Sequence, residues 1–224
     1  MTLQQQSWNS VAKLLHWLIF FMVLVEVPAG FLMANLYPFG LKYKEVTPLA
    51  HLLAQIHHTN GFLLLGVMLA RLAWRWTHPA PSLPQDLAVL QRRIARGVQT
   101  LLNVALISLP ITGWMAMSVL ADSVAFGRTQ IWFFASDDLV PRILAPKPWN
   151  DPQGYAYVAK FHRWLVYTGA ALLTLHLVAA LTHHFWRRDR VLTGMWPLAD
   201  VHGSAGSRSD QTPQIRANKC QSRR

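Results

Sequence analysis

Four stretches of this chain are long and apolar enough to cross a membrane, and they constrain its fold more than any other feature. They cover about residues 11–33, 52–76, 98–121 and 157–186, and a spanning helix needs roughly 20 mainly apolar residues. With 52% hydrophobic and 14% charged residues, the chain is too apolar for an ordinary soluble domain. The first stretch has no small-residue cleavage site, so we expect it to be retained. The sequence predicts an all-α integral membrane four-helix bundle.

The basic residues are divided unequally between the two ends of such a bundle. If both termini lie on one side, that side holds 14 of the 21 lysines and arginines, among them Lys13, Arg71, Arg75 and the cluster of Arg92, Arg93 and Arg96. Basic residues favour the cytoplasmic side, so we expect both termini in the cytoplasm, with the protein in the bacterial inner membrane. The net charge of +11 then serves orientation and contact with anionic membrane lipid, and no nucleic-acid partner is expected.

The chain is expected to divide into three parts. Residues 1–10 form a cytoplasmic stub, whose Asn9 or Ser10 caps the first helix. Residues 11–199 form the transmembrane domain. Residues 200–224 form a basic cytoplasmic tail with too little apolar surface to fold, so this tail is predicted to be disordered.

Three connections link the predicted spans. We expect short loops at about 36–50 and 77–93, and a long outer connection at 122–156. A short interfacial helix is expected at about 132–144, because aromatic residues favour the membrane surface.

Histidines are costly inside a membrane and usually functional there. In an up-and-down bundle, His16 lies near the cytoplasmic end of the first helix and His57 near the outer end of the second. On the fourth helix, His162 and His176 are separated by about 21 Å in depth, at about 1.5 Å per residue, and by roughly 40° in direction. The spacing therefore predicts an outer pair, His57 with His162, and an inner pair, His16 with His176.

Two such pairs suit two haem irons, each held between axial imidazoles inside a helical bundle. A small divalent ion would need further ligands converging on one point. The lone Cys220 and the absence of a Cys-x-x-Cys-His motif exclude covalent attachment. We therefore expect two non-covalent haem b groups with iron ligands His16, His57, His162 and His176. For each histidine the alternative is a hydrogen bond to a neighbouring helix.

The other histidines fit this pattern less well. His58 points about 100° away from His57, and His183 and His184 lie at the headgroup level beside basic residues. His51, His78 and His202 are expected in loops or in the tail.

Three glycines and one arginine are expected to surround the haems. Gly30, Gly61 and Gly169 lie at the depths and faces of the histidines and would leave room for a flat ring, with close helix packing as the alternative. Arg71, 14 residues after His57, lies at the depth of the inner pair. It is expected to pair with a haem propionate, unless it extends outward as a membrane anchor.

Glu26 is the one acidic residue inside a predicted span. It is a candidate catalytic group, as the acceptor of a proton from a quinone in the outer half of the membrane. The alternative is an ion pair with Lys160 or Arg163.

Four segments are similar to the bacterial cytochrome b561 family: LLHWLIF at 14–20, HHTNGFLLLGVMLARLAWR at 57–75, LPITGWMAMS at 109–118 and HLVAALTHHFWRRDRVLTGMWP at 176–197. Members are four-helix membrane cytochromes with two non-covalent b haems. The resemblance implies the same four ligands as the depth argument. The chain departs from the family in its outer connection and at Arg163, where an acidic residue often follows the third ligand.

Iron with two axial imidazoles has no open position, so it should pass electrons without binding oxygen. The resemblance implies a quinone-linked oxidoreductase or electron carrier of the respiratory chain, acting between ubiquinone and a second donor or acceptor, a periplasmic or membrane redox partner. Two alternatives stay open. One is a membrane-anchor cytochrome b subunit for a separate dehydrogenase or reductase, and the other is a haem-free transporter whose histidines bind protons.

Overall fold

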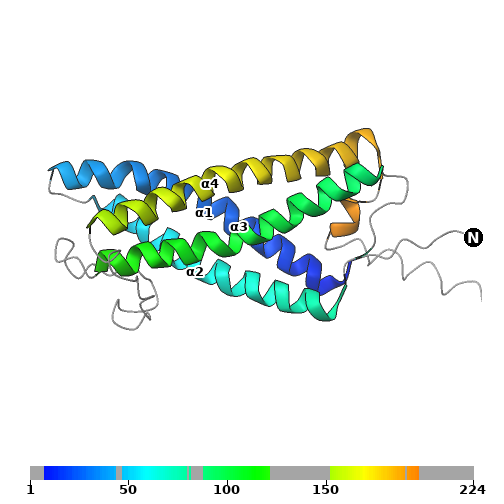
Figure 1. Ribbon diagram of the computed structural model, residues 1–224, viewed down its shortest axis with the longest axis horizontal. Coiled ribbons are helices and arrows are strands. Elements are labelled where there is room, and N and C mark those ends of the chain that lie inside the picture. The colour runs from blue at the N-terminus through cyan, green and yellow to red at the C-terminus, as the bar shows by residue number, and fades with distance from the viewer. Residues whose placement is uncertain are drawn as a thin grey trace, which may run out of the picture.

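The computed structural model is a bundle of four long helices followed by two short helical turns (Figure 1). It describes residues 8–43, 47–79, 81, 88–121, 152–189 and 191–196. The helices are α1 (Ser10–Tyr43), α2 (Pro48–Thr77), α3 (Val89–Ala121) and α4 (Pro152–Leu181), and the turns are the π-helix η2 (Thr182–Trp186) and the 3₁₀ turn η3 (Thr193–Met195).

All four long helices are long and apolar enough to span a membrane. The candidate spans are Ser10–Leu36, Pro48–Thr77, Val89–Ser118 and Ala156–Trp186. Many large apolar side chains on them are more than half exposed, including Leu14, Phe31 and Trp164. An apolar surface of this extent suits a lipid environment, and the predicted all-α membrane bundle is confirmed.

The helices extend further than the apolar windows. The predicted loop at 36–50 is largely helical, because α1 continues to Tyr43 and α2 begins at Pro48. α3 begins at Val89, so the cluster of Arg92, Arg93 and Arg96 lies in a helix and not in a connection. The physical reason is that hydropathy marks only the lipid-facing part of a helix, whereas the helix can continue into the headgroup layer, where polar residues are tolerated. At the first helix, Asn9 is the cap, since its Oδ1 accepts from the Val11 N–H at 2.8 Å.

The predicted outer connection at 122–156 is helical from Pro152 onward. The rest of that connection, the expected interfacial helix at 132–144, the tail at 200–224 and Cys220 lie outside the described residues.

The bundle is organised as two antiparallel helix pairs. α1 packs against α2, α3 packs against α4, and α2 joins the pairs by packing against α3. Ile19, Leu64 and Met68 form the buried centre of the first pair. The start of α1 and the end of α4 lie at the same end of the bundle (Figure 1). We call this the terminal end and the opposite one the far end.

α4 ends in an unusual turn at the terminal end. In η2 the helix widens, and the Arg187 N–H donates to the Thr182 carbonyl at 3.0 Å, five residues back. The Asp189 N–H then donates to the His183 carbonyl at 3.2 Å, while Arg188 has φ 51°. A left-handed residue after the last turn is typical of a helix stop, and this position is usually taken by glycine. Here the position is taken by arginine, which makes the turn depend on other contacts.

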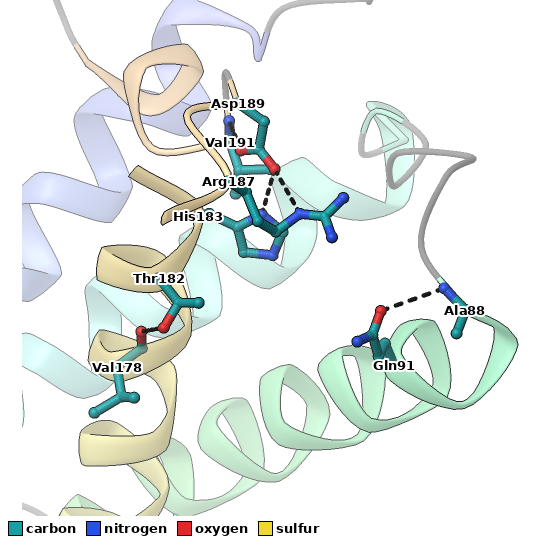
Figure 2. Close-up of polar contacts among 8 residues, drawn as sticks. All are labelled: Ala88, Gln91, Val178, Thr182, His183, Arg187, Asp189 and Val191. Carbon is teal, nitrogen blue, oxygen red and sulfur yellow. Dashed lines mark hydrogen bonds and ion pairs between the residues drawn. The ribbon is translucent and has the colours of Figure 1, made fainter. Parts of the chain in front are cut away.

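The Asp189 carboxylate supplies those contacts (Figure 2). Its Oδ2 accepts from His183 Nδ1 at 2.5 Å and from Arg187 Nε at 3.3 Å, and its Oδ1 accepts from the Val191 N–H at 3.1 Å. Burial raises the pKa of Asp189, but these hydrogen bonds outweigh burial, so the pKa lies below its ordinary value. The carboxylate therefore stabilises the turn at neutral pH, and this stabilisation is lost as the pH falls through the lowered pKa.

The turn directs the following residues back onto α1. Trp17 Nε1 donates to the Met195 carbonyl at 2.8 Å, and the rings of Trp17 and Trp196 meet edge to face with centroids 5.4 Å apart. The residue after η3 is thus fixed beside the first turns of α1.

Replacing Asp189 by Asn should release residues 191–196 from the bundle, because an amide nitrogen cannot accept the hydrogen bonds that a carboxylate oxygen accepts. We expect chymotrypsin to cleave after Leu192 about tenfold faster, as loss of charge-assisted bonds raises local opening by this order. Arg188→Gly is the matched control, since it keeps Asp189 and relieves the left-handed residue, and it should cleave no faster than the unmodified protein. Equal cleavage of all three proteins would show that Asp189 does not hold the turn.

Candidate functional site

The four histidines predicted as ligands lie in two pairs. The rings of His16 on α1 and His176 on α4 have centroids 6.3 Å apart and planes inclined by 66°. The rings of His57 on α2 and His162 on α4 have centroids 6.4 Å apart and planes inclined by 87°. These are the partners that depth along the helices predicts. Each pair connects one helix pair of the bundle to the other.

The ring separations fit two imidazoles that bind one iron from opposite sides. A metal–nitrogen bond is about 2 Å long and the ring centroid lies about 1 Å beyond the nitrogen, so two such rings have centroids about 6 Å apart. Rotation about the metal–nitrogen axis leaves the angle between the ring planes free. The residues present at both pairs therefore fit a haem with two axial histidines.

The packing of the helices also fits a group held between the pairs. In the described part of the chain, the backbone of α4 makes at most slight contact with α1, although His16 and His176 face each other. Bundle cofactors are commonly bound between facing helices in this way.

The hydrogen bonds of His57 determine which of its nitrogens is available. Its Nδ1 lies 3.0 Å from Glu26 Oε1 and 3.3 Å from the Glu26 carbonyl oxygen. Both partners are acceptors, so Nδ1 carries the hydrogen and donates. The lone pair of Nε2 is then free to bind a metal, as in most metal-binding histidines, whose other nitrogen donates to a carboxylate or carbonyl.

A residue of α3, Thr112, orients the ring of His162 in the way that Glu26 orients the ring of His57. Its Nδ1 lies 2.9 Å from Thr112 Oγ1, and the Thr112 hydroxyl donates to the Leu109 carbonyl at 2.9 Å. Because the hydroxyl hydrogen is already used, Thr112 accepts from His162 Nδ1. The Nε2 lone pair of His162 is thus available on the side of His57.

Glu26 has partners that the sequence analysis did not foresee. Its Oε2 accepts from Asn60 Nδ2 at 2.6 Å, and the same amide donates to the Met22 carbonyl at 3.0 Å. Glu26 is 16% exposed, whereas the alternative partners Lys160 and Arg163 are exposed on α4. The carboxylate therefore belongs to a polar contact between α1 and α2 that includes His57.

The predicted glycines have different neighbours from one another. A Cβ at Gly30 would lie 2.5 Å from His57 Cε1, and one at Gly61 would lie 2.9 Å from Glu26 Oε1. These two glycines make room for the imidazole and for its carboxylate partner. A Cβ at Gly169 would only touch Leu109, at 3.6 Å, so its expected role beside a haem stays a prediction.

Gly113, which the sequence analysis missed together with Thr112 and Asn60, would place a Cβ 3.5 Å from His162 Cε1. In the sequence, the sign that could have pointed to Gly113 was its place directly after Thr112 in the segment LPITGWMAMS.

The inner pair lies close to basic residues. Arg71 on α2 interacts electrostatically with both His16 and His176. Among the described residues no carboxylate forms an ion pair with Arg71, which suits the predicted pairing with an anionic group of a cofactor. Lys13, one turn before His16, is buried.

The remaining described histidines have other neighbours. His183 bonds Asp189, His78 stacks on Trp74 at 3.9 Å, and the ring of His58 lies beside that of His57 with centroids 5.8 Å apart. Within the described residues, no three His, Cys, Asp or Glu side chains converge as they would around a small metal ion.

Comparison with known proteins agrees with the resemblance of the four segments. The model of the prokaryotic cytochrome b561 family matches residues 7–198. The chain is also similar to cytochrome b561 homolog 2 of Escherichia coli (strain K12), with 25% identity over 192 residues, 85% of this chain and 91% of that protein. Since the family match includes all four spans and both histidine pairs, this chain belongs to the prokaryotic cytochrome b561 family.

Proposed function

We propose that this protein carries electrons across the bacterial inner membrane by holding two b haems, one at each histidine pair. Its family makes it a membrane b-type cytochrome of electron transfer. The observation that carries the proposal is the separation of the paired rings, 6.3 Å and 6.4 Å between centroids, which suits axial coordination at both ends of the bundle.

His57 and His162 would hold the outer haem, and His16 and His176 the inner one. A bound haem supplies an iron that changes its oxidation state by one electron. With an imidazole of each pair bound on either side of the iron, the site would offer oxygen no open position. Glu26 and Thr112 keep the outer rings oriented through Nδ1. Arg71 would neutralise a propionate at the inner pair.

The redox partners are proposed to be ubiquinone within the membrane and a second donor or acceptor. Both oxygens of Glu26 already contact His57 or Asn60, so we infer that Glu26 serves His57 and does not take protons from a quinone. The terminal end is assigned to the cytoplasm because the tail and the start of α3 are rich in basic residues. The far end then faces the periplasm. Cytochrome family membership argues against a haem-free transporter.

Purified protein should contain two haem b per chain, measured by the pyridine haemochrome assay. Replacing His57 or His162 by Ala should remove one haem, and replacing His16 or His176 should remove the other, because a haem that loses an axial ligand is held weakly. His58→Ala is the matched control and should retain both haems. One haem in the unmodified protein, or loss of a haem from His58→Ala with none lost from His57→Ala, would contradict the assignment.

Gly30→Ala should also lower the haem content from two to one, since the added Cβ would lie 2.5 Å from His57 Cε1 and displace the ring. The control is Gly66→Ala, on the same span as His57, where an added Cβ meets nothing within 4 Å. The haem assay should give two haems for Gly66→Ala. If Gly30→Ala retained both haems, haem binding would not require the His57 ring at its observed position.

Reduced protein should be reoxidised by a soluble ubiquinone analogue more than about tenfold faster than by oxygen, because a six-coordinate iron offers oxygen no position. Stopped-flow absorbance of reduced protein, mixed with the analogue or with air-saturated buffer, compares the two rates. A faster reaction with oxygen, or a spectral shift with carbon monoxide, would reveal an open iron. If neither reagent acts and a dehydrogenase co-purifies, the chain is instead the membrane anchor of that enzyme.

A further inference from the structure

The outer pair has a partly buried carboxylate, that of Glu26, in its immediate surroundings. Glu26 Oε1 lies 3.0 Å from His57 Nδ1, and Glu26 Oε2 accepts from Asn60 at 2.6 Å. Both carboxylate oxygens therefore take part in contacts between α1 and α2 beside the His57 ring. Two basic residues of α4, Lys160 and Arg163, lie close to His162 in the sequence. Both are exposed, so solvent and lipid headgroups screen their charges.

The inner pair has charges of the opposite sign. Arg71 on α2 lies near enough to His16 and His176 for its charge to act on both rings, and Arg75 follows one turn later on the same helix. The one carboxylate described near this end, Asp189, is already shared by His183 and Arg187.

Such charges act on the midpoint potential of a coordinated metal. A carboxylate that accepts from the Nδ1–H of an axial histidine makes that imidazole a stronger electron donor and stabilises the oxidised metal. A nearby cation stabilises the reduced metal instead. Both effects are stronger in the apolar interior of a membrane protein than in water.

We propose that Glu26 and Arg71 set the two haem sites at different midpoint potentials, the His57–His162 site low and the His16–His176 site high. This inference rests on the proposed function, because it requires a haem at each pair. If propionates are present at both sites, Arg71 offsets those of the inner site, whereas Glu26 adds a further negative charge at the outer one. The order of the potentials is therefore kept.

The consequence is a preferred direction for the electron. With a haem at each pair, an electron would pass from the His57–His162 site, which would be oxidised, to the His16–His176 site, which would be reduced. Glu26 is thus a positioning residue, acting through His57, and it makes the far end the favourable side for electron entry. Electrons would leave at the terminal end.

The first test is a spectroelectrochemical titration of the purified holoprotein, which should resolve two one-electron waves. His16→Ala and His176→Ala should retain the wave of lower potential, and His57→Ala and His162→Ala the wave of higher potential. The reverse order in the single-haem variants, or two equal potentials in the unmodified protein, would overturn the inference.

The second test changes one charge at a time. Glu26→Gln should raise the lower wave by at least a tenfold change in the oxidised-to-reduced ratio, about 59 mV for one electron, and leave the upper wave in place. Glu26→Asp, which keeps the anion, should shift less than Glu26→Gln. Arg71→Gln should lower the upper wave, while Arg71→Lys, the charge-conserving control, should not.

The two proposals fail in different ways. A haem content below two in the unmodified protein overturns the proposed function and the inference with it. Two haems whose waves do not move in Glu26→Gln and Arg71→Gln overturn the inference alone. If Glu26→Gln loses its outer haem, the Arg71 variants and the order of the unmodified waves still decide.

Discussion

The structure depends on placing imidazole rings inside an apolar bundle, where a polar group without a partner is costly. His57 and His162 each use Nδ1 for a contact within the chain, so only Nε2 is left to be satisfied. Water is scarce at that depth, and the proposed iron between the two rings would satisfy both nitrogens at once. The described backbones of α1 and α4 make at most slight contact, which suits a group held between the two helix pairs.

Helix geometry explains why the histidine pairs could be predicted from the sequence. The separation of His162 and His176 along α4 follows from the rise of one straight helix, and the up-and-down topology gives the depths of His16 and His57. Both quantities depend on counting residues along single helices. The observed pairs have the predicted partners, and the four-helix membrane fold follows from hydropathy in the same direct way.

The contacts that orient the rings could not be obtained by such counting. The meeting of Glu26 with His57 and Asn60, and of Thr112 with His162, depends on how far each helix is rotated about its axis and how it crosses its neighbour. The sequence analysis therefore offered Lys160 or Arg163 as the alternative partners of Glu26, and it did not foresee that Gly61 makes room for the Glu26 carboxylate. The start of α3 was also missed. The helix begins at Val89 and includes Arg92, Arg93 and Arg96, whereas the apolar window begins only after these arginines.

Different contacts surround the two histidine pairs. The outer pair is oriented by side-chain hydrogen bonds between spanning helices, and one partly buried carboxylate, that of Glu26, lies beside it. The inner pair lies beside Trp17, which is hydrogen-bonded to Met195 in the segment 191–196. That segment is held in turn by Asp189, His183 and Arg187 at the end of α4. The environment of the inner pair therefore depends on a turn near the membrane surface, whereas that of the outer pair is contained within the spans.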